Sequence, residues 1–341
     1  MATVEIAWVT LAGALTAAIA MSSLLALMLR PLLSRYALAR PNARSSHSAP
    51  TPQGGGIAVI IATTVVLAGT AVLVPSSFHN PTELIVLFAC ATALAVLGAT
   101  DDIHPLETLP RLAVQSIAVL FALAYLPPEV HILRELPWWL DRALLVFAVL
   151  WFVNLVNFMD GVDWMTVVEV VPVTAALALF GFIGALPSDA TLVAAALCGA
   201  VLGFAPFNRP VARLFLGDVG SLPIGLLVGW LLVLLANEHL AAALLLPLYY
   251  VADATITLLR RLLTGERVLQ AHRSHFYQRA LDGGVGVSQI VGRVFLVNIA
   301  LVGLAAFTIL NVTPAVQALS IIVGSILVAG LLLTFSRIKK A

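Results

Sequence analysis

Aspartates near predicted helix ends are the residues of this chain whose type and spacing could do chemistry. Five of them stand in three separate loops: Asp101, Asp102, Asp160, Asp163 and Asp218. Carboxylates at a helix C-terminus oppose the negative end of the helix dipole, so Asp101 and Asp102 favour an external cation. Because adjacent residues point about 100° apart on a helix, we expect one of this pair to reach a site and the other to support it or handle a proton. The alternative is solvated charge at a helix end.

A polar stripe leads to the third of these acids. Asn154, Asn157 and Asp160 recur every third residue in WFVNLVNFMDGVDW, so on a helix they share one face. Burying two amides and a carboxylate at membrane depth is costly unless they meet partners or a polar cavity. Polar contact between packed helices is one interpretation, and we favour the other, a polar site. Gly161 directly afterwards allows the backbone to approach a ligand closely.

Asp218 lies between Gly217 and Gly220 in LFLGDVGSLPIG, at the start of a predicted span. The free N–H groups of a helix N-terminus attract anions, and a carboxylate beside them is an oxygen ligand of the kind that Mg²⁺ takes together with phosphates. The segment therefore predicts a compact site for a metal-bound phosphate. Ser221 as an ordinary helix cap is the alternative interpretation.

Two basic segments offer groups that could recognise phosphate. RRLLTGERVLQAHRSHFYQRAL contains His272, Arg273 and His275 among further arginines, and imidazole with guanidinium suits a diphosphate. Charge bias or attraction to lipid headgroups is the alternative, and a zinc site lacks further clustered ligands. The earlier RPNARSSHSAPTPQGGG offers His47, Thr51 and backbone amides to a phosphate, or is a flexible linker.

Transmembrane helices must position these residues. Of the 341 residues, 61% are hydrophobic and 10% are charged, against about a quarter charged in soluble domains. We expect an all-α polytopic integral membrane protein with about 11 transmembrane helices and a single catalytic domain over residues 1–341. At roughly 20 residues per span, about 120 residues remain, too few for a separate soluble domain. The predicted spans are 4–29, 54–74, 82–100, 112–126, 143–159, 165–186, 188–206, 216–236, 239–259, 287–310 and 313–336.

Basic residues set the expected orientation. Of the 18 arginines and lysines, 15 fall in the alternate loops that share one face, and cytoplasmic loops keep the excess of positive charge. The N-terminus is therefore predicted outside and the C-terminus cytoplasmic. The only lysines are Lys339 and Lys340, which excludes a Walker-A loop and a Schiff-base lysine. The active site is expected in the cytoplasmic loops at about residues 30–53, 101–111, 160–165, 207–218 and 260–286.

Five motifs in a fixed order resemble those of one family. They are SSHSAPTPQGGG, GATDDIHPL, NLVNFMDG, FLGDVGS and AHRSHFYQR, across residues 45–279. The family is the polyprenyl-phosphate N-acetylhexosamine-1-phosphate transferases, of glycosyltransferase family 4 type. The branch that the chain resembles initiates bacterial O-antigen and enterobacterial common antigen. The peptidoglycan-precursor branch typically has three consecutive histidines and a lysine in its first inner loop, whereas this chain has HRSH and no such lysine.

The resemblance implies an enzyme of the bacterial plasma (inner) membrane with its active site facing the cytoplasm. It would transfer an N-acetylhexosamine 1-phosphate from a UDP-sugar to undecaprenyl phosphate, releasing UMP and forming the first lipid-linked sugar of a cell-surface polysaccharide. Mg²⁺ would be the cofactor, with Mn²⁺ as a substitute. The expected partners are the two substrates, membrane lipids and a second copy of the chain, with no nucleic acid.

Matching positions imply roles for the motif residues. Asp218 would be the magnesium ligand, with Asp101 and Asp102 near the metal and the lipid phosphate. Asp160 would be the third catalytic acid, on the nucleotide side of the site. Asp253 matches an acidic position in some relatives, without an assigned role. The expected substrate-binding residues are His47, Thr51, Asn154, Asn157, His272, Arg273 and His275.

The implied chemistry needs charge neutralisation more than a general base. A phosphate monoester has a second pKa of about 6, so at pH 7 the lipid phosphate is mostly a dianion that the diphosphate repels. A magnesium ion with arginine and histidine around it would neutralise that charge. We expect direct in-line attack at the β-phosphorus, with Asp101 or Asp102 positioning or deprotonating the lipid phosphate. A covalent phosphosugar on an aspartate is the alternative.

A secondary transporter of an anionic or lipid-phosphate substrate is the alternative class of protein. Transporters place ionisable groups near the bilayer midplane. Only Glu169, Asp253 and Arg293 are candidates for such positions in this chain, because most acids cluster at the inner surface. The sequence therefore favours the transferase.

Overall fold

The computed structural model describes residues 8–39, 50–266 and 272–338. Helices dominate, because in a bilayer an apolar segment must satisfy its backbone hydrogen bonds internally. Within these ranges, nine helices are long and apolar enough to cross a membrane. They are α1 Trp8–Tyr36, α2 Gly56–Leu73, α3 Pro81–Ile103, α5 Trp138–Met159, α6 Met165–Phe182, α7 Ser188–Asn208, α8 Asp218–Leu245, α11 Val287–Leu310 and α12 Pro314–Arg337.

Shorter elements connect these helices. The antiparallel strands β1 and β2 pair Leu38 with Pro52. With so little strand, the chain is an all-α polytopic membrane protein, as predicted. The shorter elements are α4 Thr108–Ala124, α9 Leu248–Leu263, α10 Phe276–Asp282, a 3₁₀ turn at Pro75–Ser77, β1 Leu38–Ala39 and β2 Thr51–Pro52.

The predicted spans and the observed helices differ in two places. The fourth predicted span is α4, which has only 17 residues. The ninth, predicted over 239–259, is broken: α8 ends at Leu245 and α9 begins at Leu248, with Pro247 between them. Proline lacks the N–H that a continuous helix needs. The predicted boundary between the eighth and ninth spans coincides with a kink in α8 at His239.

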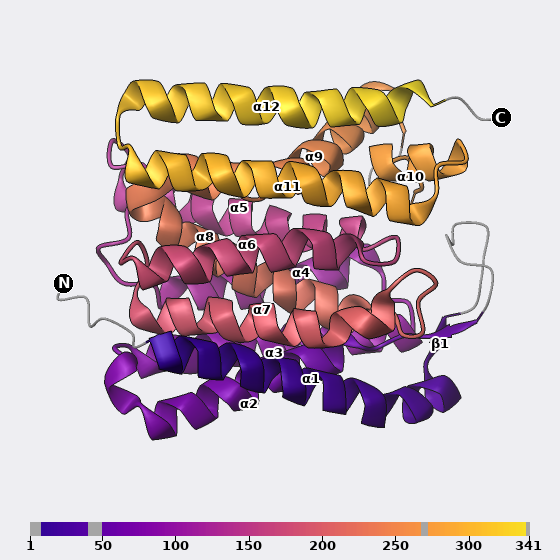
Figure 1. Cartoon of the computed structure of the whole chain (residues 1–341), viewed down its shortest axis with the longest axis horizontal. Coiled ribbons are helices and arrows are strands. Elements are labelled where there is room, and N and C mark those ends of the chain that lie inside the picture. Colours follow the sequence, from indigo (N-terminus) through magenta and orange to yellow (C-terminus); the bar gives the residue numbers. More distant parts are fainter. Residues whose placement is uncertain (1–7, 40–49, 267–271, 339–341) are drawn as a thin grey trace.

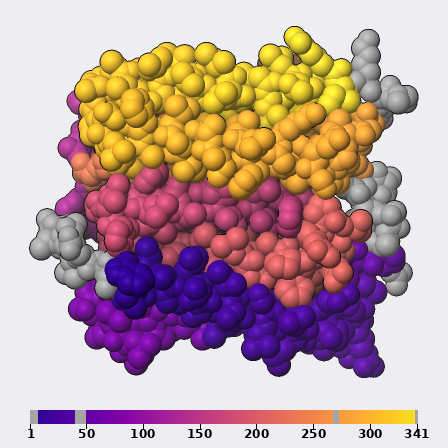
Figure 2. All heavy atoms as spheres, viewed as in Figure 1, coloured from indigo at the N-terminus to yellow at the C-terminus, as the bar shows by residue number. Residues whose placement is uncertain are grey.

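The helices form layers around α8. The most apolar stretch of α8 is wholly buried, against 22% of the corresponding stretch of α1. Figure 1 shows α1 and α2 at one edge of the bundle and α11 and α12 at the other, and Figure 2 shows the same layering on the surface. α1 begins and α12 finishes at opposite ends of the bundle, and β1 and α10 lie at the end where α12 finishes (Figure 1). Which end faces the cytoplasm stays a prediction.

Candidate active site

The acidic ends of α3 and α8 meet at the end of the bundle that carries α10. The last turn of α3 holds Asp101 and Asp102, and α8 begins at Asp218. The two helices approach closely because Gly98 of α3 has no side chain. A Cβ atom there would lie 2.3 Å from both the carbonyl carbon and the carbonyl oxygen of Asp218. This contact gathers three of the predicted acids into one cluster.

Asp102 supports this cluster by binding the backbone at the start of α8. Its Oδ1 accepts the backbone N–H of Asp218 at 3.0 Å, and its Oδ2 accepts that of Val219 at 3.2 Å. Both oxygens therefore cap the N-terminus of α8, where a carboxylate is favoured by the helix dipole. Gly217 has a φ of +76°, and a Cβ atom there would lie 2.5 Å from Asp102 Oδ2. The geometry makes Asp102 the supporting member of the pair, and its catalytic role stays a prediction.

Arg111 links the other two acids, and the sequence interpretation missed it. Its Nη1 lies 2.7 Å from Asp101 Oδ2 and 3.5 Å from Asp218 Oδ2. Asp101 Oδ1 also accepts the backbone N–H of Leu106 at 2.6 Å. In the sequence, Arg111 counted only as part of the positive-inside charge. The signal that could have found it is the short turn through Pro105, which folds α4 back toward the aspartate pair.

The segment before α2 fixes the approach to α8. Phe215 donates its backbone N–H to Pro52 O at 2.8 Å, and Gln53 forms an isolated bridge with the same residue. Gln53 Nε2 also donates to the backbone oxygen of Asp102 at 3.1 Å. The first predicted loop therefore reaches the acidic cluster through its backbone and through this glutamine.

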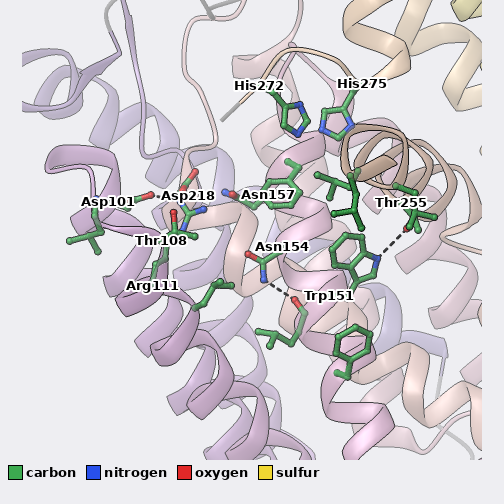
Figure 3. A pocket seen from close by; sticks show the side chains of 18 of the residues that line it. Asp101, Thr108, Arg111, Trp151, Asn154, Asn157, Asp218, Thr255, His272 and His275 are labelled. Carbon is green, nitrogen blue, oxygen red and sulfur yellow. Dashed lines mark hydrogen bonds and ion pairs between the residues drawn. The ribbon is translucent and has the colours of Figure 1, made fainter. Parts of the chain in front are cut away.

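A cavity of about 890 Å³ opens beside the acids. Most of its wall is apolar and comes from α4, α5 and α9, including Phe147, Leu150 and Leu259. Its charged end gathers residues from α3, α4, α8 and the segment before α10 (Figure 3). The cavity thus combines an apolar wall with a cluster of ionisable groups. The polar residues at that end are Asp101, Arg111, Asn154, Asn157, Asp218, His272 and His275.

Two members of the polar stripe line this cavity. Asn157 Nδ2 donates to Ser221 Oγ at 2.9 Å, and Asn154 Nδ2 donates to Leu150 O at 2.9 Å. Figure 3 shows both amides on the face of α5 that looks into the cavity. The three-residue spacing therefore placed these two side chains on the same cavity wall.

Asp160 ends the stripe without lining the cavity. It is the C-cap of α5, and its Oδ1 accepts a hydrogen bond from the Thr166 hydroxyl. Burial raises the pKa of Asp160 to about 7, and the nearby Asp102 and Asp163 act in the same direction. The carboxyl is therefore partly protonated at neutral pH, and its catalytic role stays a prediction.

Asp253 holds the histidine segment in place. Its Oδ1 lies 3.3 Å from His275 Nδ1 and accepts the backbone N–H of Phe276 at 3.0 Å, while Oδ2 accepts that of Tyr277 at 3.3 Å. It therefore caps α10 and fixes the ring of His275. A ring N–H on Nδ1 can donate to this carboxyl group, which leaves Nε2 as the remaining ring nitrogen. This contact gives Asp253, whose role the sequence left open, a positioning function.

His272 stands beside His275, with ring centroids 4.9 Å apart. Burial lowers the pKa of His272 to about 4, and the positive charges of His275, Arg261 and Arg260 act in the same direction. The imidazole is therefore neutral at pH 7. Its Nδ1 lies 3.0 Å from the hydroxyl of Ser274.

Two of the other predicted binding residues, Thr51 and Arg273, do not line this cavity. Thr51 is buried in β2. Arg273 pairs with Asp282 at 3.0 Å. His47 lies outside the described residues. Their predicted roles in substrate binding stay predictions.

The charged end of the cavity fits a cation shared with a bound phosphate. In the described ranges, no group of three or more His, Cys, Asp or Glu side chains is arranged to hold a metal ion. Mg²⁺ usually takes one or two carboxylates together with phosphates and waters, and Asp101 and Asp218 supply two. The Arg111 guanidinium between them shows that this position attracts positive charge.

Comparison with known proteins shows which family the chain resembles. Residues 84–236 match the glycosyl transferase family 4 profile. The chain is 28% identical over 337 residues to the decaprenyl-phosphate N-acetylglucosaminephosphotransferase of Mycobacterium tuberculosis (strain ATCC 25618 / H37Rv), covering 88% of this chain and 82% of the relative. It is 25% identical over 296 residues to the probable undecaprenyl-phosphate N-acetylglucosaminyl 1-phosphate transferase of Bacillus subtilis (strain 168), covering 81% and 80%.

A third relative is the phospho-N-acetylmuramoyl-pentapeptide-transferase of Mycobacterium sp. (strain JLS), at 29% identity over 275 residues, covering 67% of this chain and 76% of the relative. The chain is thus an integral membrane protein by its helices, and residues 84–236 are similar to glycosyl transferase family 4. These relatives support the resemblance to the polyprenyl-phosphate N-acetylhexosamine-1-phosphate transferases that the five motifs predicted.

Proposed function

We propose that this protein transfers an N-acetylhexosamine 1-phosphate from a UDP-sugar to undecaprenyl phosphate, releasing UMP. The observation that carries the proposal is the cavity whose apolar wall of Phe147, Leu150 and Leu259 ends at Asp101, Arg111 and Asp218. A lipid phosphate has the same two parts, a hydrocarbon chain and a charged head. The names of two relatives, which act on decaprenyl or undecaprenyl phosphate, support the lipid acceptor.

The product is proposed to start a cell-surface polysaccharide of the O-antigen type. Support comes from the histidine motif, in which Arg273 and Ser274 separate His272 from His275. The N-acetylglucosaminephosphotransferase of M. tuberculosis also aligns with more of this chain than the pentapeptide-transferase does, at 88% against 67%. By the same proposal the protein lies in the bacterial inner membrane with the site facing the cytoplasm.

Mg²⁺ is the proposed cofactor, with Mn²⁺ as a substitute. Asp218 and Asp101 would hold it, because their carboxylates converge on Arg111 and face the cavity. When bound, the ion would neutralise the charge of the donor diphosphate and of the leaving UMP. Asp102 would keep Asp218 at the start of α8 through its two hydrogen bonds to the helix backbone.

The chain's own residues then suit direct attack by the lipid phosphate on the β-phosphorus of the donor. The bond between the lipid phosphate oxygen and the β-phosphorus forms, the bond to the α-phosphate oxygen breaks, and UMP leaves. Arg111 and the His272–His275 pair would bind the phosphate oxygens, because cationic and imidazole N–H groups pair with developing negative charge. Both Asp102 oxygens are occupied by α8, so Asp101 is the better candidate to position the acceptor.

A labelled transfer assay tests the proposal. Purified protein is given undecaprenyl phosphate and each of a panel of radiolabelled UDP-N-acetylhexosamines, with and without Mg²⁺. We expect lipid-extractable product that requires Mg²⁺ and disappears in Asp218→Asn. Glu238→Gln is the matched control, because that side chain is 65% exposed and contacts only Arg134 and the neighbouring Asn237 among the hydrogen bonds and ion pairs of the described chain.

Two outcomes would contradict the proposal. Absence of product from every donor, in protein shown to be folded, would favour the transporter alternative. A labelled sugar phosphate trapped on the protein without lipid acceptor would replace direct attack by the covalent route. The similarity of residues 84–236 to glycosyl transferase family 4 supports the enzyme over the transporter.

A further inference from the structure

We propose that Glu169 of α6, Asn298 of α11 and Tyr250 of α9 form a buried proton site, bridged by one water molecule, that the transfer reaction does not use. None of the three side chains is more than 2% exposed. α6 and α11 lie side by side (Figure 1), and none of these residues lines the cavity of the candidate active site.

Buried oxygens without hydrogen-bond partners indicate the site. Asn298 Nδ2 donates to Val168 O at 2.9 Å and to Glu169 Oε2 at 2.7 Å, which uses both amide hydrogens. Three buried oxygens then lack a partner in the described chain: Glu169 Oε1, Asn298 Oδ1 and Tyr250 Oη. Tyr250 lies close enough to Glu169 for the two groups to interact electrostatically. Buried polar groups are normally paired with protein or with ordered water, so three orphans from adjacent helices indicate a missing common partner.

The common partner of these three oxygens must balance the negative charge of Glu169. No ion pair of the described chain includes this carboxylate, and an uncompensated charge at membrane depth is expensive. A hard metal ion takes about six oxygen ligands, twice the number of orphans. A proton needs only one oxygen, so protonation of Glu169 neutralises the site with the atoms present.

One water completes the hydrogen bonds. A buried water makes about three of them, which equals the number of orphan oxygens. It would accept from the protonated Glu169 Oε1 and donate to Asn298 Oδ1 and Tyr250 Oη, while the Tyr250 O–H would donate to the neighbouring Thr166 hydroxyl. The site would thus join three helices beneath the histidine segment, because Tyr250 lies about one turn before Asp253 on α9.

The site also adjoins the acidic end of α5. The Tyr250 hydroxyl lies beside the Thr166 hydroxyl and interacts electrostatically with Asp160, and the Thr166 hydroxyl donates to Asp160. Hydroxyl groups therefore lie between the buried carboxyl and Asp160. The proton site rests on burial, hydrogen bonding and the proximity of Tyr250 to Glu169, so it stands whether or not the proposed transferase function holds.

Infrared spectroscopy of the full-length protein in lipid nanodiscs tests the site at neutral pH. A protonated carboxylic acid has a C=O stretching band that an ionised carboxylate lacks. We expect the wild-type spectrum minus that of Glu169→Gln to contain this band and to show its downshift in D₂O. In the matched control, Glu238→Gln, we expect loss of carboxylate bands only, because that acid is exposed and paired.

Tyr250→Phe tests the shared partner. Removing one hydroxyl should shift the frequency of the Glu169 band without abolishing it, because the water loses one of its contacts. Loss of carboxylate bands in Glu169→Gln, together with a melting temperature of wild type that rises with Na⁺, would overturn the proton in favour of a cation. An unshifted band in Tyr250→Phe would remove Tyr250 from the site. If Glu169→Gln does not fold, a wild-type spectrum without any deuterium-sensitive band would itself contradict the proposal.

Discussion

At the scale of single residues, Arg111 is the side chain on which the charge balance of the cavity depends. It lies 2.7 Å from Asp101 and 3.5 Å from Asp218. We predict that Arg111→Ala lowers kcat/KM for sugar-phosphate transfer by about 10²–10³, the usual effect of removing one donor to developing charge. The kcat/KM of Arg111→Lys should lie between those of wild type and Arg111→Ala, because lysine keeps the charge but not the planar fork of arginine.

Steady-state kinetics with both substrates checks this prediction. Arg134→Ala is the control, since its ion pair with Glu238 is exposed at both ends and such pairs contribute little. Equal rates for wild type and Arg111→Ala would mean that the guanidinium only neutralises the two carboxylates in the free protein.

His272 gives a prediction about protons. Its pKa of about 4, lowered by burial and by neighbouring positive charge, makes the ring neutral at pH 7. An anion beside it favours the charged form, so a bound diphosphate should raise this pKa toward the ordinary value. We predict that the UDP-sugar is bound with proton uptake at pH 6 to 7, and that the uptake disappears in His272→Gln.

Calorimetric titration in two buffers of different ionisation enthalpy measures that uptake. A binding enthalpy that is the same in both buffers would show that His272 keeps its protonation state. His131, whose Nε2 lies 3.1 Å from Leu136 O in the loop before α5, provides the control variant His131→Gln, which should leave the uptake unchanged.

The sequence predicted which residues belong to the candidate site better than it predicted the role of each one. Asp101, Asp218 and the asparagines could be selected because polar groups at helix ends or on one helical face are rare in an apolar chain. Their convergence at one cavity agrees with that selection. The separation of Asp101 from Asp102 could not be predicted, because it depends on which carboxylate reaches the first N–H groups of α8. Arg111 was missed because its sequence context is that of any positive-inside charge.

At the scale of helices, the crossing of α3 and α8 sets the acidic cluster. Gly98 is where the two backbones meet, and a Cβ atom there would lie 2.3 Å from the backbone of Asp218. We predict that Gly98→Ala destabilises the protein by about 1–3 kcal/mol, the usual penalty for overpacking. It should also lower transfer activity, because the start of α8 must shift away from Asp102.

Thermal unfolding in detergent and the transfer assay together check this prediction. Gly69→Ala is the matched control, since that glycine lies in α2 with no atom within 4 Å of the added methyl group, and alanine favours a helix interior. A normal Tm and normal activity in Gly98→Ala would mean that the helices can separate without disturbing the acids.

Helix identity was predictable from apolar run length, but helix continuity was not. The interruption at Leu246 and Pro247 lies inside a hydrophobic stretch that reads as one span. Asn237 and Glu238, just before the kink at His239, bind the loop between α4 and α5 through His131 N and Arg134. Tertiary contacts of this kind decide where a helix stops, and a hydropathy pattern does not contain them.

At the scale of the whole molecule, the bundle places an apolar wall and a charged cluster in one cavity, so the two substrates should be separable by mutation. Leu259 of α9 belongs to the apolar wall. We predict that Leu259→Trp raises KM for undecaprenyl phosphate about tenfold, since an overpacking penalty of about 1–3 kcal/mol spans that factor. KM for the UDP-sugar should not change, because the proposed donor would bind through Asp101, Arg111 and Asp218, which belong to α3, α4 and α8 rather than to α9.

Kinetics with each substrate varied in turn checks the separation, and Leu296→Trp is the control because that leucine is 68% exposed on α11 and does not line the cavity. A short-chain prenyl phosphate offers a second arm of the experiment. If the apolar wall holds the hydrocarbon chain, the short acceptor should bind weakly to wild type and to Leu259→Trp. The substitution should then raise the KM for this acceptor little further. A rise in KM for the UDP-sugar equal to that for the lipid would instead mean that α9 moves as a unit and carries His275 with it through Asp253.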